Sequence, residues 1–322
     1  MACGSLWKAE VPHIALVTVD GRCLVLWKDE EGAWQNRLVH QAPSGLSAVA
    51  IGDADPGAPG PDLIVGTGGG QVLSISERAG RDIVVRLIFE AKAPISDLAV
   101  HDFNSAIPGD ETLVLSEDGK ATLLWPVPES VKGEFESLVI LQDTGRLRNV
   151  LAGPYGPQNQ AGAVVVGTSG NVTRLHAVGN AWRVANLYQN PEPLARIAGG
   201  NIDPTSETRE LIIADDAGLI TILHQNAGGY IPQAVYKEEK ALRGVAAGEL
   251  DPALPGDEFA VFGYGMEVAM FSRMSPEFNR TMLFKDSDKG HWLIACQLDM
   301  QNQRHELIAV GYSGKVTLID YH

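Results

Sequence analysis

Polar side chains, most of them acidic, recur along this chain in two sets that lie seven residues apart. The first set follows a short apolar run and comprises Asp55, Asn104, Asp203, Asp251 and Asp299. The second set precedes the next apolar run and comprises Asp62, Glu111, Glu210, Glu258 and Glu306. Ca²⁺ binds several hard oxygen ligands, whereas carboxylates in turns also accept hydrogen bonds from the backbone amides of their own loop. The residue types therefore allow a metal site or a structural one.

Arginine and aromatic side chains occupy a second kind of position, where the repeated segments stop resembling one another. They stand at the start of an apolar run or in the hairpin that follows it: Arg148, Arg196, Arg243, Tyr264, His291, Trp292 and Tyr312. Arginine pairs well with carboxylate and phosphate, and aromatic residues are frequent anchors of interfaces. We predict that these residues form one surface that binds a protein or peptide partner, including a partner with an acidic group. Exposed arginine and tyrosine are also ordinary surface residues, and this alternative stays open.

Aligning the repeated segments with one another gives these residues a register. Trp292 falls in the column of Arg243, and His291 falls in the preceding column, with Leu242. Arg196 lies one place later than Arg243 in its own segment. Because side chains alternate along a strand, Arg196 is the member that we expect to point between two sheets instead.

The elements that position these residues come from an internal repeat. A strand, a Pro- or Gly-rich loop, a second strand, a glycine turn and a third strand recur every 47 to 51 residues. The turn glycines are Gly21, Gly70, Gly119, Gly170, Gly218, Gly265 and Gly314. A period of roughly 50 residues built from short strands is typical of β-propellers, whose units are four-stranded blades. We predict an all-β, seven-bladed propeller of antiparallel blades, with residues 1–322 as a single domain.

The two ends of the repeat leave one strand to be assigned. The last unit ends on a third strand, Lys315–Tyr321, and residues 4–10 resemble the fourth strand of other units. One interpretation is that Ser5–Glu10 pairs with Lys315–Tyr321 and closes the last blade, because such pairing removes an open edge. The other is that residues 4–10 form the first strand of the first blade, and the last blade lacks its outer strand.

Enzyme motifs are absent from the sequence. It contains no G-x-S-x-G, H-E-x-x-H, paired C-x-x-C or Walker loop. His101 and Asp102 are the sole adjacent His–Asp pair, and no nucleophile or metal set accompanies them. We predict a non-catalytic scaffold without catalytic residues or a cofactor. The alternative is a propeller enzyme of the sugar lyase or lactone hydrolase type, with its site at the central channel.

Residues 52–72, GDADPGAPGPDLIVGTGGGQV, follow the pattern G-D-x-D-P-x-x-P-G-x-E-L-x-V-G…G-x-V. This pattern resembles the FG-GAP/VCBS repeat of integrin-α-like propellers, and the resemblance covers nearly the whole chain. It implies a propeller fold and a binding role in adhesion or in intracellular scaffolds. Family members that bind calcium carry D-x-D-x-D-G in this loop, whereas proline follows Asp55, Asp203 and Asp251 here. We therefore predict that the acids accept hydrogen bonds from the loop and that no metal binds.

Composition narrows the class of partner and the location. A net charge of −15 argues against nucleic acid as a partner, and no apolar run is long enough for membrane insertion. Residues 1–10 lack the features of a signal peptide. Cys3, Cys23 and Cys296 are few and scattered, which predicts no disulfide framework and a reducing compartment. We predict a cytoplasmic protein, with secretion as the alternative if a signal peptide has been removed.

Overall fold

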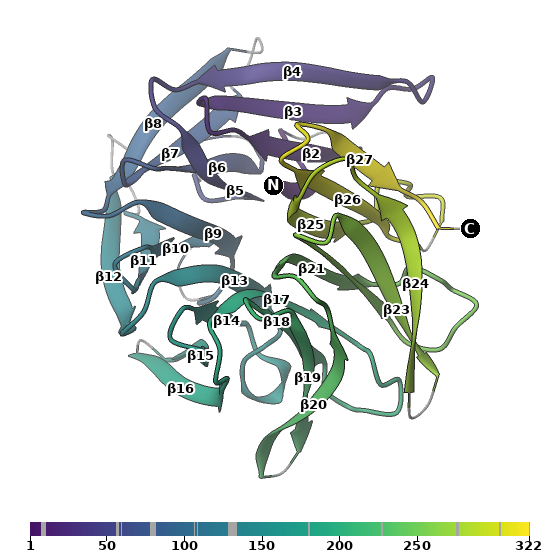
Figure 1. Cartoon of the computed structure of the whole chain (residues 1–322). Coiled ribbons are helices and arrows are strands. Elements are labelled where there is room, and N and C mark those ends of the chain that lie inside the picture. The colour runs from purple at the N-terminus through teal and green to yellow at the C-terminus, as the bar shows by residue number, and fades with distance from the viewer. Residues whose placement is uncertain are drawn as a thin grey trace. The chain divides into compact units, whose positions relative to one another are not determined.

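The computed structural model describes residues 1–7, 11–55, 58, 60–77, 82–105, 107, 109–127, 134–179, 181–226, 228–274, 277–302 and 304–321. The chain divides into two compact units, each described here by itself. The first unit comprises Met1–Val165 and Arg174–Ala185, and the second comprises Val166–Thr173 and Asn186–His322. Regular structure is β-strand almost throughout, as predicted, with one short 3-10 helix, η1 (Pro157–Asn159) (Figure 1).

The strands form seven sheets, in which consecutive strands are neighbours. The first strands are β1 (Ala2–Ser5), β5 (Leu46–Gly52), β9 (Ile95–His101), β13 (Leu147–Gly153), β17 (Leu194–Gly200), β21 (Leu242–Gly248) and β25 (Gly290–Cys296). The second strands are β2 (Pro12–Val17), β6 (Asp62–Thr67), β10 (Glu111–Ser116), β14 (Gly162–Gly167), β18 (Glu210–Asp215), β22 (Glu258–Gly263) and β26 (Glu306–Gly311).

The third and fourth strands complete the sheets. The third strands are β3 (Arg22–Lys28), β7 (Gln71–Glu77), β11 (Lys120–Pro126), β15 (Asn171–Val178), β19 (Leu219–Asn226), β23 (Glu267–Met274) and β27 (Val316–Ile319). The fourth strands are β4 (Trp34–Gln41), β8 (Ile83–Glu90), β12 (Phe135–Gln142), β16 (Ala181–Gln189), β20 (Gly229–Lys237) and β24 (Glu277–Lys285). Six sheets thus have four strands, and the last, β25-β26-β27, has three in the described residues.

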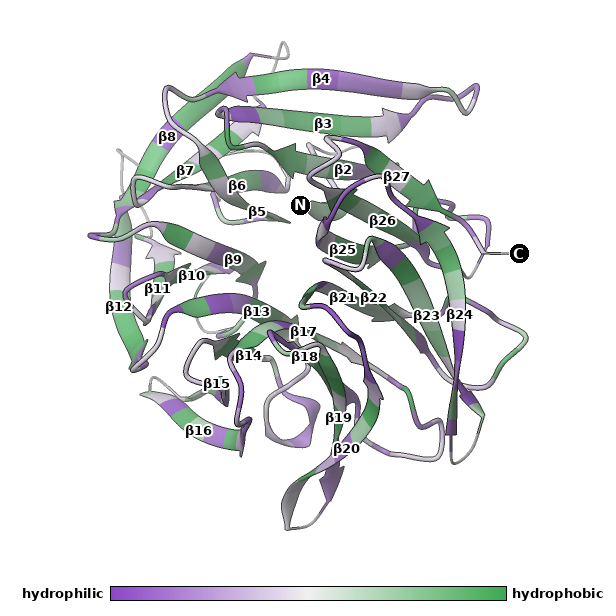
Figure 2. Cartoon of the chain, in the orientation of Figure 1, coloured by the Kyte–Doolittle hydropathy of each residue, from purple (hydrophilic) through white to green (hydrophobic). Residues whose placement is uncertain are grey.

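The hydrophobic core lies between neighbouring sheets. Strands such as β18 and β22 are buried along their whole length, which explains their continuous apolar sequences because both faces are covered. Phe259 and Phe271 stack with ring centres 5.0 Å apart, in a cluster that also holds Ile212 and Ile220 of the preceding sheet. In Figure 2 the second strands are mainly hydrophobic, whereas the fourth strands mix hydrophobic and hydrophilic residues.

A left-handed residue closes the hairpin between the second and third strands. The φ angle is positive at six of the seven predicted turn glycines: Gly21, Gly70, Gly119, Gly170, Gly218 and Gly314. In the sixth sheet the left-handed residue is Met266, with φ of 68°, and not Gly265. The amide of Met266 donates to the Gly263 carbonyl at 3.1 Å, as the amide of Gly70 does to that of Thr67. The predicted turn residue of this sheet, Gly265, therefore lies one position before the actual one.

The N-terminal residues belong to the first sheet. Strand β1 pairs antiparallel with β2, and Ser5 lies opposite Pro12. Leu6 is fully buried in the core of the first two sheets, and burial of a leucine stabilises a fold by about 2 kcal/mol. The predicted pairing of Ser5 with the last strand is therefore wrong, and the other interpretation holds for residues 4–5. Residues 8–10 lie outside the described residues.

Two further expectations concern membranes and cysteines. Within the described ranges, no helix has the length and apolarity needed to cross a bilayer. Cys23 is a buried free thiol, and burial raises its pKa to about 12. Cys3 and Cys296 are disulfide-bonded, which contradicts the prediction from scattered cysteines, because spacing along a chain does not report whether cysteines can pair. The cysteines thus no longer support a reducing compartment, and the cytoplasmic location stays a prediction.

Candidate binding surface

Three first strands of the second unit begin with a β-bulge. The paired residues jump from Leu194 to Arg196, from Leu242 to Gly244, and from Gly290 to Trp292. The residues left unpaired are Ala195, Arg243 and His291. A bulge redirects a side chain away from the regular alternation of a strand. It therefore places Arg243 and His291 at the end of the sheet where the hairpins also lie.

The bulges correct the register predicted for the last unit. Gly290 takes the place of the leucine that starts the other first strands, so His291 is equivalent to Arg243. Trp292 is equivalent to Arg196 and to Gly244, since each lies opposite the fifth residue of its second strand. The predicted alignment of the last unit with the other units was shifted by one residue, because a glycine in a leucine position gives no hydrophobic signal.

Six of the seven predicted site residues contact one another in the second unit. We call them the Arg–aromatic cluster: Arg196, Arg243, Tyr264, His291, Trp292 and Tyr312. The guanidinium carbon of Arg196 lies 4.0 Å from the ring centre of Trp292, and that of Arg243 lies 4.8 Å from the ring centre of Tyr264.

Ring contacts join the two halves of the cluster. His291 lies 6.5 Å from Trp292 and 5.6 Å from Tyr312 between ring centres, and Tyr312 lies 6.5 Å from Tyr264 in an edge-to-face arrangement. Tyr312 is 58% exposed, and the side chain of His291 is also exposed. The cluster is therefore open to solvent.

Gly244 positions the strands beneath the cluster. A Cβ atom at Gly244 would lie 2.8 Å from the backbone nitrogen of Leu293, closer than a real Cβ approaches. Only glycine allows β21 and β25 to come this near. The missing side chain also leaves open the register position between Arg196 and Trp292, so the Arg196 side chain can reach the indole.

Hydrogen bonds hold Arg243 in place and lower the pKa of Tyr264. Nη1 of Arg243 donates to Asp216 Oδ1 at 2.6 Å and to the Leu242 carbonyl at 2.7 Å. Hydrogen bonding to Arg243 lowers the pKa of Tyr264, and the Lys289 ammonium lies 5.3 Å from the Tyr264 ring centre. Lys289 is a neighbour of the cluster that the sequence analysis missed. Its only signal was its place just before a first strand.

His291 is neutral at pH 7. Partial burial lowers its pKa to about 4, and the positive charges of Arg196 and Arg243 act in the same direction. A neutral imidazole can both donate and accept a hydrogen bond.

Arg148 is the one predicted site residue in the first unit. It follows Leu147 on β13 and is half-buried. Its membership of the same surface stays a prediction.

Several members of the two acidic sets accept hydrogen bonds from their own loops, as predicted. Glu258 Oε2 accepts from the amides of Leu250 and Asp251 at 3.0 and 2.8 Å. Glu111 and Glu306 accept amide bonds in the same way. The first-set residues accept from the amide two positions later, at distances of 2.9 to 3.1 Å: Asp203, Asp251 and Asp299. Burial raises the pKa of Glu258 to about 7.

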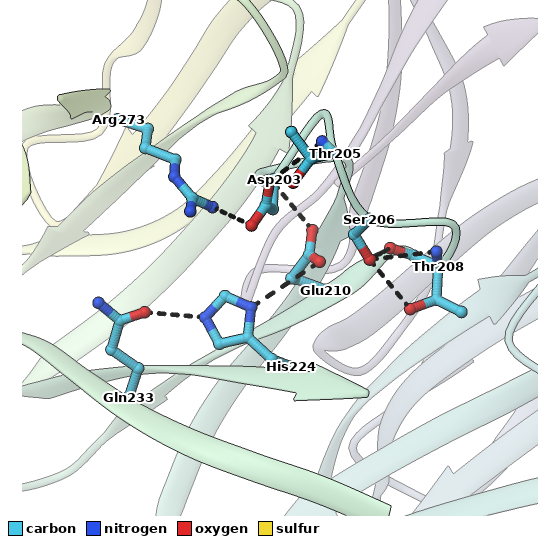
Figure 3. Close-up of polar contacts among 8 residues, drawn as sticks. All are labelled: Asp203, Thr205, Ser206, Thr208, Glu210, His224, Gln233 and Arg273. Atoms are coloured by element: carbon cyan, nitrogen blue, oxygen red, sulfur yellow. Dashed lines mark hydrogen bonds and ion pairs between the residues drawn. The ribbon is translucent and has the colours of Figure 1, made fainter. Parts of the chain in front are cut away.

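One of these loops carries an additional polar network (Figure 3). Asp203 pairs with Arg273 of the next sheet at 2.8 Å and accepts from Thr205. The buried Glu210 faces His224, with Nδ1 3.8 Å from Oε1, too long for a hydrogen bond but within ion-pair range. The other ring nitrogen of His224 is 2.8 Å from Gln233 Oε1. These contacts raise the pKa of His224, with Glu210 as the main cause.

Comparison with known proteins identifies the fold. No family model matches the chain, and no curated protein sequence matches it. A similar solved structure is the WD40 β-propeller domain of Doa1, with a TM-score of 0.69 and 12% identity, covering 100% of this chain and 92% of that one. The chain is a seven-bladed β-propeller. At this identity the likeness shows the fold, and each sheet described above is one blade.

Proposed function

We propose that this propeller is a non-catalytic interaction module, and that the Arg–aromatic cluster binds an acidic group of a protein or peptide partner. The observation that carries the proposal is the way both arginines are held. Each guanidinium lies with its face against an aromatic ring, a contact that uses the positive charge and not the N–H edge. Nη1 of each arginine also donates within the protein, from Arg196 to the Ala195 carbonyl and from Arg243 to Asp216. A guanidinium has five N–H donors, so its edge suits a carboxylate or phosphate as well.

The composition of the surface supports the same class of partner. Arg196, Arg243 and Lys289 contribute three positive charges, and Asp216 pairs with one of them. The chain as a whole carries a net charge of −15, so long-range repulsion disfavours acidic ligands elsewhere on the protein. An acidic partner would therefore select this surface. The resemblance to FG-GAP repeats fits a binding module, although a fold does not fix a function.

A peptide selection tests the proposal. We expect peptides selected from a random displayed library to be enriched in Asp and Glu, and Arg196→Ala with Arg243→Ala to weaken their binding by roughly tenfold or more. Arg183→Ala is the matched control, because Arg183 is an exposed arginine on β16. Selection of peptides without acidic residues, or equal binding by the double variant, would contradict the proposal.

The enzyme alternative has one observation in its favour. Tyr264 and His291, both with lowered pKa, lie in the same cluster as two arginines, and perturbed groups gather at catalytic sites. A lyase acting on acidic sugars would need this combination of a base and a cation beside the carboxylate. Incubation with uronate polymers tests it: an unsaturated product that Tyr264→Phe abolishes would favour the enzyme over the scaffold.

A further inference from the structure

The third strand of the last blade lacks the cover that its equivalents have. Val316 is 43% exposed. The residue at the same position in the other six blades, two places after the turn residue, is 0% exposed in every case: Cys23, Val72, Ala121, Val172, Ile220 and Val268. Val316 is more exposed because, among the described residues, β27 is the outer strand of its sheet, whereas a fourth strand covers the third strand of the other sheets.

Among the described residues, the turn before β27 also lacks a hydrogen bond that the other six turns make. In six blades the carbonyl of the turn residue accepts a hydrogen bond from the residue after the fourth strand, for example Gly70 from Ala91 at 2.8 Å and Met266 from Asp286 at 2.8 Å. Within the described part of the chain, the Gly314 carbonyl has no such bond.

Among the described residues, no atom fills the space beside this turn. A Cβ at Gly70 would lie 2.6 Å from the Ala91 carbonyl oxygen, and one at Gly218 would lie 2.5 Å from that of Glu238. A Cβ at Gly314 would have no atom within 4 Å. In the described part of the chain, an exposed apolar residue, a turn carbonyl without the usual backbone bond and open space thus coincide at one strand edge.

We propose that the outer edge of β27 is a second interaction surface, which receives an extended strand from a partner protein as the fourth strand of the last blade. Addition of a strand to an open sheet edge gives main-chain hydrogen bonds along its length, and side-chain pockets give selectivity. This surface is distinct from the Arg–aromatic cluster, and the proposal does not depend on what that cluster binds.

The other blades define the chemistry of the incoming strand. Opposite the position of Val316 they carry a large side chain, as in the pairs Val72–Phe89, Ile220–Tyr236 and Val268–Phe284. The residue before it is a bulged aliphatic that packs on the core: Val39, Ile88, Ile140, Val235 or Leu283. The partner strand therefore runs antiparallel to β27 and carries an aliphatic residue followed by a large, usually aromatic one.

A partner strand fits this edge better than a second copy of β27. The fourth strands of the other blades are eight or nine residues long. Strand β27 is four residues long. Two copies paired through β27 would therefore cover about half the length that a fourth strand covers.

A peptide from the chain itself is the probe. Residues 277–286, EFNRTMLFKD, contain the fourth strand of the sixth blade and the residue whose amide reaches the turn carbonyl. We expect the fluorescein-labelled peptide to bind the whole protein saturably in an anisotropy titration. Replacing Leu283 and Phe284 by serine in the peptide should abolish binding. Amides of residues 314–319 should gain protection from hydrogen exchange.

Variants of the protein locate the site. Val316→Asp should weaken peptide binding by roughly tenfold or more, without loss of folding because the side chain is exposed. Val184→Asp is the matched control, since Val184 is 47% exposed on a complete blade. Absence of saturable binding, equal binding by Val316→Asp, or protection elsewhere would overturn the proposal. So would self-association of the wild type that Val316→Asp removes, which would assign the edge to a second copy.

Discussion

Arg196 lies over the ring of Trp292 although β21 runs between the strands that carry them. The guanidinium carbon is 4.0 Å from the ring centre, and Gly244 is the residue of β21 at the same register. Alternation along β17 had suggested that Arg196 points between sheets. It does so, and it joins the cluster because the intervening residue has no side chain.

Gly244→Ala should therefore lower stability and disturb the cluster. The added methyl group meets the backbone nitrogen of Leu293 at 2.8 Å, and overpacking of this kind costs about 1–3 kcal/mol. Urea unfolding measures the loss. Gly265→Ala is the control, because a Cβ there has nothing within 4 Å. Equal effects of the two substitutions would show that the close approach of β21 and β25 has no energetic role.

Met266→Gly should stabilise the protein. Met266 has φ of 68°, a left-handed conformation that costs an L-residue about 1–2 kcal/mol, while glycine loses part of this gain through its flexible unfolded state. We expect a net gain of up to about 1 kcal/mol in thermal unfolding. The reverse exchange, Gly218→Met, should destabilise, because its Cβ would lie 2.5 Å from the Glu238 carbonyl oxygen. A destabilised Met266→Gly protein would refute this explanation of the turn.

The His224–Glu210 pair should stabilise the protein in mild acid. The folded-state pKa of His224 is raised above 6.5, so its contribution is fully present below about pH 6.5 and is lost as the pH rises through the raised value. His224→Gln should therefore cost stability at about pH 5.5 and little at about pH 8.5. Unfolding by urea at the two pH values measures this.

His40 is the matched control for that experiment. Burial lowers its pKa, so the folded state resists protonation and His40→Gln should gain stability in acid relative to the wild type. A loss for His224→Gln that is the same at both pH values would show packing and not charge.

Calcium should leave stability unchanged. Glu258 and Glu306 already accept amide hydrogen bonds from their loops, which leaves them poorly placed to bind an ion. A ligand present at about 100 times its Kd would add about 2.7 kcal/mol. Thermal unfolding with EDTA and with added Ca²⁺ tests this, with Mg²⁺ as the control cation. A calcium-specific rise of that size would restore the metal interpretation.

The sequence predicted most of the fold because strand and turn signals are local. Short apolar runs and turn glycines such as Gly70 depend on neighbouring residues alone. Met266 shows where this fails, since a tertiary context holds a non-glycine residue in a left-handed turn. Leu6 shows it again: residues 4–10 resemble the fourth strand of other units, yet Leu6 is fully buried in the core of the first two sheets.

The candidate surface was predictable in composition but not in register. Arginine and aromatic residues at positions that differ between units identified six residues that contact one another. Gly290 hid the bulge that makes His291, and not Trp292, the equivalent of Arg243. Gly244 and Lys289 were missed because a glycine that permits close approach and a lysine before a strand have no distinct sequence pattern.

The buried acids also bear on the order in which the protein folds. The loop amide bonds to Glu111, Glu210, Glu258 and Glu306 join residues seven or eight positions apart, as between Leu250 and Glu258 or Leu298 and Glu306. Contacts at such short separation form rapidly, because little chain entropy is lost on closing the loop. During synthesis, each repeat can form the hydrogen bonds of its own loop before the following repeat has left the ribosome. The slow steps are then left to the pairing of blades with one another.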